Sequence, residues 1–235
     1  MPESLIKDVS DTAFWIAYHR ALESARPDAP FHDPLAARLA GEHGRQIAEA
    51  MPASRMFGCS VSIRTRIVDD YILAAVAEGA DVILNLGAGL DTRPYRMNLP
   101  PSLRWIEADY AHIIEYKEAL LVSEPPRCEL GRVKIDLADR VKRREFLAAV
   151  DASAKRILVL TEGVVPYLSV EDAASLADDL RELKHVRSWV VDYFSPEATK
   201  YRHRQGMDRK MRNAPFRFEP AHWHGFFRKT VSSAK

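Results

Sequence analysis

Short apolar runs alternate with helical patterns from residue 81 onward, and this alternation constrains the fold more than any other feature of the chain. Five runs of strand-like composition span residues 81–86, 103–108, 132–135, 156–161 and 188–193. Helical patterns separate them at about 110–122, 140–150 and 170–184. Strands and helices that alternate at this spacing form βαβ units with right-handed crossovers. The sequence therefore predicts a doubly wound α/β fold with a mostly parallel sheet.

The residues before this region have helical spacing that prolines interrupt. A short helix is expected from Pro34 to about Gly41. A longer helix is expected over residues 61–78, with Ile63, Ile67 and Tyr71 along one face. No repeat or low-complexity linker divides the chain. We therefore expect one domain over residues 1–235, with a helical cap at 1–60 and a cofactor-binding α/β core at 61–235.

The composition excludes several classes of protein. The 34 basic and 33 acidic side chains nearly cancel, so no overall field attracts nucleic acid or an anionic membrane. No stretch approaches the ~18 consecutive apolar residues of a membrane span. The first ten residues lack the apolar run of a signal peptide, and the two cysteines form no disulfide framework. These features predict a cytoplasmic protein.

Two features near the carboxyl end could indicate a binding site, but for both we prefer the interpretation as ordinary surface residues. His222 and His224 flank a tryptophan, but two histidines alone make a weak metal signal, so we expect no metal site. Residues 200–217 contain seven basic side chains. They suggest either an anion-binding patch or a helix with a solvated basic face and Met207 and Met211 inward, and we favour the solvated face.

A glycine turn follows the first strong strand. In the string Leu86-Gly-Ala-Gly-Leu-Asp-Thr92, Gly87 and Gly89 allow a sharp turn and the close approach of a ligand. Glu107 lies twenty residues after Gly87, and Asp109 lies two further on, at the end of the second strand. A carboxylate there can accept hydrogen bonds from both hydroxyls of a ribose. This layout suits a cofactor that contains adenosine.

The loop chemistry favours S-adenosylmethionine over a dinucleotide. A dinucleotide fingerprint would have a third glycine or alanine where Thr92 stands. Asp91 is also poorly suited to lie beside a diphosphate. S-adenosylmethionine has no phosphate, and its ammonium group tolerates an acidic loop.

At this point the chain resembles the leucine carboxyl methyltransferase family, which includes many bacterial O-methyltransferases. The first motif of that family is similar to the string from Ile83 to Arg93. Further segments resemble its cap, its arginine-bearing helix and its second- and fourth-strand motifs: Asp11-Thr-Ala, Tyr18-His-Arg-Ala21, Phe31-His-Asp-Pro34, Ser62-Ile-Arg-Thr-Arg-Ile-Val-Asp69, Ile106-Glu-Ala-Asp109 and Thr161-Glu-Gly-Val-Val-Pro-Tyr-Leu168. The resemblance implies a Rossmann-like methyltransferase sheet with S-adenosylmethionine as cofactor.

The resemblance also implies roles for single residues. Arg64 would pair with the carboxylate of the cofactor, a bidentate task that suits a guanidinium. Glu162 would lie near the ammonium group, and Gly87 would approach the methionine part closely. Asp109, with Glu107, would hold the ribose hydroxyls.

Further implied contacts concern the adenine and the methyl acceptor. Asp136 and Leu137 would contact the adenine, with Asp136 accepting from its exocyclic amine. Tyr167 and Tyr193, at the ends of the fourth and fifth strands, either line the acceptor pocket or pack as structural aromatics. The implied acceptor is a carboxylate or hydroxyl of a small molecule or of a protein C-terminus. A carboxylate is already ionised at neutral pH and needs no base, so no catalytic base is assigned.

The chain departs from the family pattern in two places. The family has a proline soon after the second-strand aspartate, whereas this chain has Tyr110-Ala111-His112. The family also continues into a final pair of strands, of which residues 230–233 would be only the start. Such a chain leaves one sheet edge uncovered, and a homo-oligomer is one way to cover it.

Two other functions remain open on the sequence alone. One is an NAD- or nucleotide-binding Rossmann protein, against which the pair Asp91-Thr92 argues. The other is a non-catalytic regulator that keeps the methyltransferase fold. A pocket blocked by cap residues such as Trp15 or Phe31 would indicate the regulator.

Overall fold

The described residues form one five-stranded sheet in which all neighbouring strands are parallel. The computed structural model describes residues 4–52, 54–220, 222, 223 and 225–227. The strands are β1 (Val82–Leu86), β2 (Arg104–Asp109), β3 (Glu129–Lys134), β4 (Ile157–Thr161) and β5 (Val186–Val191). Their order across the sheet is β3-β2-β1-β4-β5. The predicted doubly wound α/β fold is confirmed.

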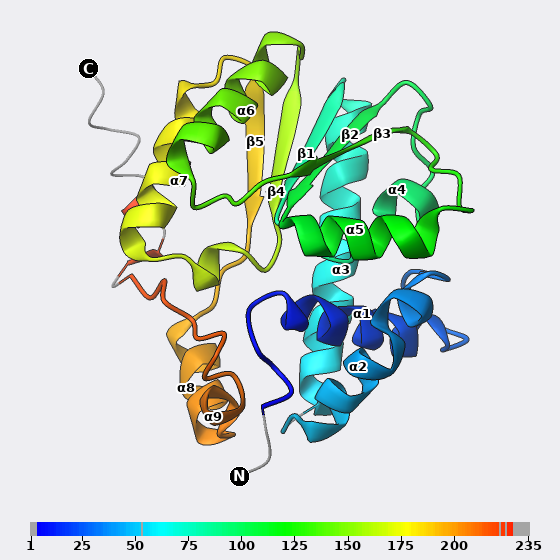
Figure 1. Cartoon of the computed structure of the whole chain (residues 1–235), viewed down its shortest axis with the longest axis vertical. Helices are drawn as coiled ribbons and strands as arrows, with labels where there is room; N and C mark the ends of the chain where they lie inside the picture. Colours follow the sequence, from blue (N-terminus) through cyan, green and yellow to red (C-terminus); the bar gives the residue numbers. More distant parts are fainter. Residues whose placement is uncertain (1–3, 53, 221, 224, 228–235) are drawn as a thin grey trace.

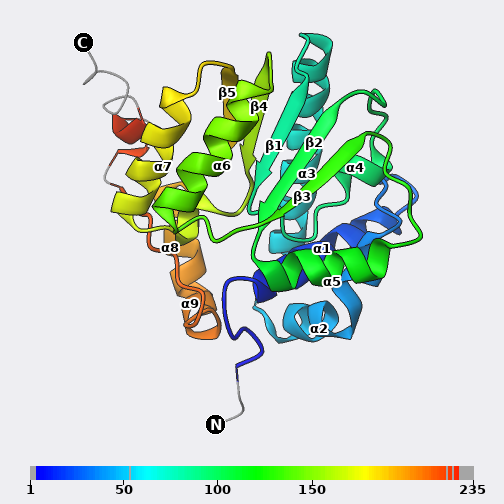
Figure 2. The same cartoon turned by 45° about the horizontal axis from the view of Figure 1, so that its top comes forward.

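Helices precede, connect and follow these strands. They are α1 (Asp11–Ser24), α2 (Ala36–Ala50), α3 (Ser54–Ala77), α4 (Arg93–Arg96), α5 (Ala111–Leu121), α6 (Arg140–Ala152), the 3₁₀ turn η1 (Val165–Tyr167), α7 (Val170–Glu182), α8 (Pro196–Arg204) and α9 (Met207–Lys210). Helices α6 and α7 lie on one side of the sheet, and α3 lies on the other (Figures 1 and 2). The predicted helices between the strands are confirmed to within a few residues.

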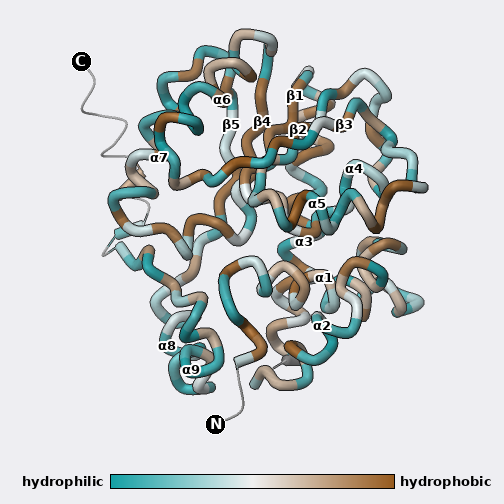
Figure 3. The backbone as a smooth tube through the Cα atoms, viewed as in Figure 1, coloured by the Kyte–Doolittle hydropathy of each residue, from teal (hydrophilic) through white to brown (hydrophobic). Residues whose placement is uncertain are grey.

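The core lies on both faces of the central strands. Strands β1 and β4 are buried along their whole length, which fits their continuous apolar sequences. Leu84 and Val159 pack with Leu147 of α6 on one face, whereas Ile83 packs with Ile72 of α3 on the other. Figure 3 shows this apolar centre, and it shows that α8 and α9 are mostly hydrophilic.

Helix α3 begins earlier than predicted, and the apolar face picked out in the sequence is not the face that packs on the sheet. The helix begins at Ser54 and crosses residue 60, so it belongs both to the cap and to the layer beside the sheet. Ile63, Ile67 and Tyr71 are exposed, and Val68 and Ile72 are buried instead. The helix carries two apolar stripes, and only contact with the sheet selects between them.

Of two other predicted boundaries, one is confirmed and one was wrong. The short helix expected to end near Gly41 does end there, because the backbone of Gly41 is non-helical at φ 54°, and a second helical segment of α2 continues to Ala50. The third strand begins at Glu129, three residues before the prediction. It is an edge strand of the described sheet, where polar residues are tolerated because one side of the strand is solvated.

The cap lies at the edge of the sheet where the strands end. Helices α1 and α2 and the first half of α3 lie below this edge in Figure 1, and α8 and α9 lie beside them. No helix of the described residues is long and apolar enough to cross a membrane. Residues 230–233, predicted as the start of the family's final pair of strands, lie outside the described residues.

Candidate functional site

A cavity of about 760 Å³ lies between the strand ends and the cap. Asn85, Asp109 and Glu162 line it from the sheet, and Trp15 and Arg64 line it from α1 and α3. Open parallel sheets bind ligands at the crevice beyond the carboxyl ends of strands whose connections run in opposite directions. In this sheet that point lies between β1 and β4.

The glycine turn forms one wall of the cavity. Gly87 and Gly89 have φ values of 69° and 49°, a region that side chains disfavour. The N–H of Gly87 donates to the carbonyl oxygen of Ala108 at 2.7 Å, which ties the turn to β2. A Cβ atom on Gly87 would also overlap Cγ2 of Val164. Both the conformation and the close packing therefore require glycine at position 87.

Asp109 joins the end of β2 to the glycine turn. Its Oδ2 accepts from the N–H of Gly89 at 2.6 Å, and its Oδ1 accepts from the N–H of Tyr110 at 2.7 Å. Burial raises the pKa of Asp109, and the two backbone donors offset part of that rise. An ionised carboxylate has about four lone-pair sites, so two further donors can still be accepted. Asp109 lines the cavity, as predicted for a ribose-binding residue.

Glu107 is placed elsewhere. Its side chain is fully buried between Lys117 and Arg132, whose nitrogens lie 2.7 and 2.9 Å from its two carboxylate oxygens. It is absent from the cavity lining, and both oxygens are engaged. The structure therefore does not bring Glu107 together with Asp109 at the cavity.

A buried charge cluster links α3, the glycine turn and the end of β4. Glu162 lies 2.9 Å from Nε of Arg64 and 2.8 Å from Nη1 of Arg93. Burial opposes the charge on Glu162, but the two guanidinium groups outweigh it and lower the pKa of the carboxyl. Burial likewise opposes the charge on Arg64, but Asp192 and Glu162 raise its pKa. These groups stay charged at neutral pH and present both signs to the cavity.

Arg93 is a central residue that the sequence reasoning missed. It binds Asp69 at 2.6 Å and Asp91 at 2.9 Å, in addition to Glu162. Because Arg93 neutralises Asp91, that aspartate does not act as the free acidic charge on which the argument against a diphosphate depended. Arg93 is the last residue of the family motif that runs from Ile83 to Arg93. Its place in that motif was the only sign in the sequence that it belongs to the site.

The remaining predicted residues divide into two groups. Asp136 and Leu137 line the cavity after β3, and Oδ1 of Asp136 accepts from the N–H of Ala138 at 2.8 Å. Tyr167 also lines the cavity. Tyr193 does not line it; its side chain is 48% exposed and its ring lies 5.6 Å from that of Trp223.

Comparison of the sequence with models of known protein families shows which family the chain belongs to. The family model of leucine carboxyl methyltransferases matches residues 13–181, which include most of the cap, the glycine turn and the strand-end acids. The chain belongs to the leucine carboxyl methyltransferase family. The predicted resemblance is confirmed.

Relatives of this family member in several bacteria are named "Putative S-adenosyl-L-methionine-dependent methyltransferase". A protein of Parafrankia is 35% identical over 185 residues, which cover 74% of this chain and 59% of the relative. One of Mycobacteroides abscessus is 31% identical over 205 residues, which cover 80% of this chain and 66% of the relative. This leucine carboxyl methyltransferase family member thus spans about three fifths of the length of such relatives.

A solved structure supports the fold of this family member. A DUF574 family protein from Streptomyces avermitilis matches with a TM-score of 0.56 and 18% identity, covering 92% of this chain and 81% of that one. Within the described part of the chain, no three His, Cys, Asp or Glu side chains are grouped so that they could hold a metal ion. His224 of the histidine pair is outside the described residues.

Proposed function

We propose that this chain binds S-adenosylmethionine in the cavity and catalyses methyl transfer to an oxygen of a carboxylate or hydroxyl. Two features of the cavity together carry the proposal. One is a pair of oppositely charged side chains, and the other is a carboxylate that can accept hydrogen bonds from a ribose. Arg64 and Glu162 match the carboxylate and ammonium of an amino acid, and Asp109 matches a ribose diol. The names of the relatives agree with this cofactor.

The residues present fit this cofactor. Gly87 lines the cavity with its backbone and carries no side chain, as expected where a ligand approaches the backbone. Nη1 of Arg64 lies 3.7 Å from Asp192, beyond hydrogen-bond distance, so its N–H groups can still donate to the carboxylate of a ligand. Leu137 and Asp136 provide an apolar and an accepting contact for an adenine.

The chain contributes mainly orientation and exclusion of water. When bound, S-adenosylmethionine supplies an activated methyl group on a sulfonium, and in-line transfer depends on alignment of the acceptor. Burial raises the pKa of Tyr167, so its hydroxyl keeps its proton at neutral pH and can donate a hydrogen bond but not act as a base. A carboxylate acceptor, with an ordinary pKa near ~4, needs no base. The proposed acceptor belongs to a small molecule or a protein C-terminus.

Calorimetric titration tests the proposed cofactor. S-adenosylmethionine, S-adenosylhomocysteine and NAD are titrated into the wild type, into Asp109→Ala and into Asp178→Ala, a half-exposed aspartate of α7 outside the cavity that serves as the matched control. We expect the two sulfur nucleosides to bind, and their affinity to fall about tenfold or more in Asp109→Ala only, because charge-assisted hydrogen bonds worth ~1.5–3 kcal/mol are lost. Circular dichroism verifies that Asp109→Ala is folded. Binding of NAD alone, or of none of the three, would overturn the proposal.

A further inference from the structure

Three arginines outside the charge cluster are also buried in the described part of the chain: Arg20, Arg143 and Arg202. Arg202 belongs to the basic stretch for which a solvated face was predicted, and that prediction was wrong for this residue, because only 7% of its surface is exposed. Met207 and Met211 do point inward, as predicted. Arg143, on α6, is the most deeply buried of the three, with 1% of its surface exposed. A charge removed from water in this way needs fixed partners in the protein.

The partners of Arg143 come from two other parts of the fold. Its Nε donates to Oδ2 of Asp179 at 2.8 Å, and its Nη2 donates to the hydroxyl oxygen of Ser175 at 2.8 Å. Both partners lie on α7, so these bonds fasten α6 to α7. Nη1 of Arg143 donates to the carbonyl oxygen of Leu137 at 2.6 Å, in the loop that joins β3 to α6. The guanidinium thus connects this loop to α7.

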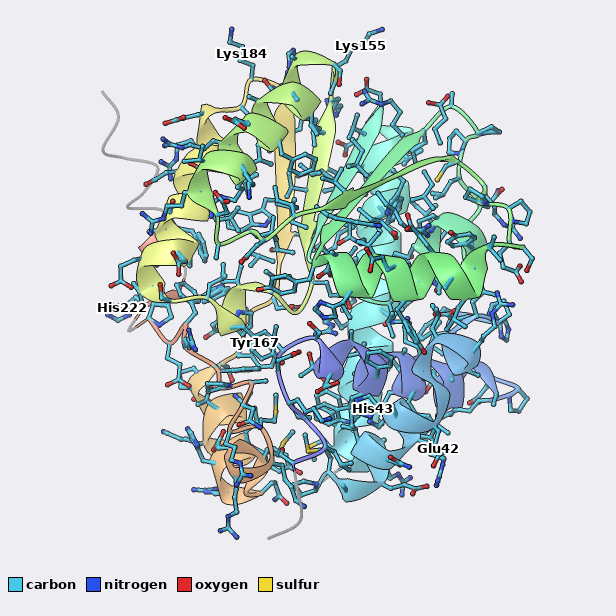
Figure 4. The ribbon with its side chains drawn as sticks, in the orientation of Figure 1. Glu42, His43, Lys155, Tyr167, Lys184 and His222 are labelled. Atoms are coloured by element: carbon cyan, nitrogen blue, oxygen red, sulfur yellow. The ribbon has the colours of Figure 1, made fainter. Side chains whose placement is uncertain are left out.

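The loop forms part of the cavity wall. Ile135, Asp136, Leu137 and Ala138 line the cavity, and the family resemblance implies that Asp136 and Leu137 contact the adenine. In Figure 4 the loop runs above Tyr167, which lines the same cavity. The buried bond of Arg143 therefore reaches the back of the proposed adenine subsite.

A single peptide group connects Arg143 to Asp136. The carbonyl oxygen of Leu137 and the N–H of Ala138 belong to the same planar unit, on opposite sides of it. Arg143 holds the oxygen, and the N–H donates to Oδ1 of Asp136 at 2.8 Å. Rotation of this unit would turn the N–H away from Oδ1, and the carboxylate would lose the bond that orients it. A carboxylate held in this way can still accept from a ligand, because it has about four lone-pair sites.

We propose that Arg143 is a positioning residue of the adenine subsite, which orients the carboxylate of Asp136 toward the 6-amino group of the base through the peptide group of Leu137 and Ala138. This inference rests on the proposed cofactor. Arg143 is not among the described residues that line the cavity, so it acts through the loop. An amino group donates to a carboxylate, whereas a 6-oxo group in its place would repel it. The orientation of Asp136 therefore determines the preference for adenine.

Arg144 provides a matched control on the same helix. Its Nε donates to Oδ1 of Asp179 at 2.6 Å, so both arginines bind the same carboxylate of α7. The side chain of Arg144 is 60% exposed, and its Nη2 extends toward Glu182. A role in joining α6 to α7 is thus shared by the two arginines, whereas the bond to Leu137 belongs to Arg143.

The test compares two nucleosides that differ at the edge of the base. S-adenosylhomocysteine, with a 6-amino group, and S-inosylhomocysteine, with a 6-oxo group, are titrated calorimetrically into the wild type, Arg143→Lys and Arg144→Lys. We expect the wild type to prefer the adenosine compound by about tenfold or more. This preference should fall severalfold in Arg143→Lys, because an ammonium lacks the fork that reaches Asp179 and Leu137 together. It should stay unchanged in Arg144→Lys. The ratio of the two affinities reports the base edge, and a merely structural role would not change it.

A double variant keeps the test decisive if Arg143→Lys does not fold. Arg143→Gln/Asp179→Asn removes both buried charges, so neither is left buried and unpaired, and it should lose the preference as well. Circular dichroism verifies that each variant is folded. An unchanged preference in the folded Arg143 variants, or an equal fall in Arg144→Lys, would overturn the inference.

The wild type separates this inference from the proposed cofactor. If it binds both nucleosides equally well, Asp136 does not read the base, and the inference fails while the proposed cofactor stands. If it binds neither nucleoside, the proposed cofactor fails and the inference fails with it.

Discussion

Gly87 shows how one residue can be required for two independent reasons. Its φ of 69° costs a side chain ~1–2 kcal/mol, and a Cβ would also overlap Val164. Gly79 separates the two causes, because its φ of 91° is equally unfavourable but nothing lies within 4 Å of a Cβ there. Position 87 therefore combines strain with overpacking, and position 79 has strain alone.

We expect Gly87→Ala to lower the free energy of unfolding by about 2–5 kcal/mol and Gly79→Ala by about 1–2 kcal/mol. Urea unfolding measures both. Val164→Ala in the Gly87→Ala background should recover part of the loss, since it removes the overlapping methyl group. Equal losses at the two glycines would show that the packing against Val164 has no energetic effect.

The candidate site was predictable where a residue's role follows from its position at a strand end. Asp109 ends β2 and was predicted from that position, whereas Glu162 directly follows β4 and was implied by the family resemblance; both line the cavity. Arg93 was missed because its burial depends on Asp69, which lies 24 positions earlier on a different helix. Arg202 was misplaced because nothing in a run of basic residues tells which one the fold turns inward.

At the scale of the element, β2 explains why two acids so close in sequence have different roles. A strand rises about 3.3 Å per residue, so Glu107 lies roughly 7 Å back from the strand end that Asp109 occupies. There it is flanked by Arg132 of β3 and by Lys117 of α5. The distance in sequence from the glycine turn predicts a ribose-binding carboxylate on β2. It does not predict which of Glu107 and Asp109 reaches the end of the strand.

Glu107→Gln should therefore affect stability and not cofactor binding. We expect a loss of about 3–5 kcal/mol in the free energy of unfolding, because Lys117 is left buried without its carboxylate. Glu115→Gln is the control, since Glu115 forms an exposed ion pair with Lys134 and its loss should have little effect on stability. Urea unfolding and titration with S-adenosylhomocysteine measure the two properties. If folded Glu107→Gln lost nucleoside binding but kept its stability, Glu107 would have to contribute to the ribose site after all.

Element boundaries were predictable where composition changes sharply, as at the buried strands β1 and β4. The buried face of α3 was not, because Ile67 and Val68 are both apolar and the pattern allows either stripe to face the sheet. The contact that decides, between Ile72 and the core cluster around Ile83, is a tertiary one.

At the scale of the whole molecule, a buried polar network fastens the cap to the glycine turn. Asp33 accepts from Nε of Arg20 at 2.9 Å and from the hydroxyl of Thr92 at 2.6 Å. Arg20 also donates to the carbonyl oxygen of Leu90 at 2.6 Å. These hydrogen bonds join the cap to the glycine turn, between residues that are more than fifty positions apart in the sequence. The family motifs of the cap predicted its presence, but not this attachment.

Helix α1 also carries a buried histidine that makes the stability of the molecule depend on pH. Burial lowers the pKa of His19 from an ordinary value of 6.5 to about 4. His19 packs against Phe57 of α3, with ring centroids 5.3 Å apart, so it lies where the cap meets the long helix. Between pH 6.5 and 4 the unfolded chain binds a proton that the folded chain does not, and stability falls as the pH is lowered.

From pH 7 to pH 5 this histidine alone should lower the free energy of unfolding by about 2 kcal/mol. The carboxyl groups of Asp91 and Glu162 have lowered pKa values, so their stabilisation is lost only at more acidic pH and does not overlap this window. Urea unfolding at both pH values should therefore show a smaller loss in His19→Phe than in the wild type. His32→Phe, which replaces an exposed histidine of the cap, should retain the full loss. If His19→Phe lost as much stability as the wild type, His19 would have to be protonated in the fold, and the junction between α1 and α3 would have to admit water.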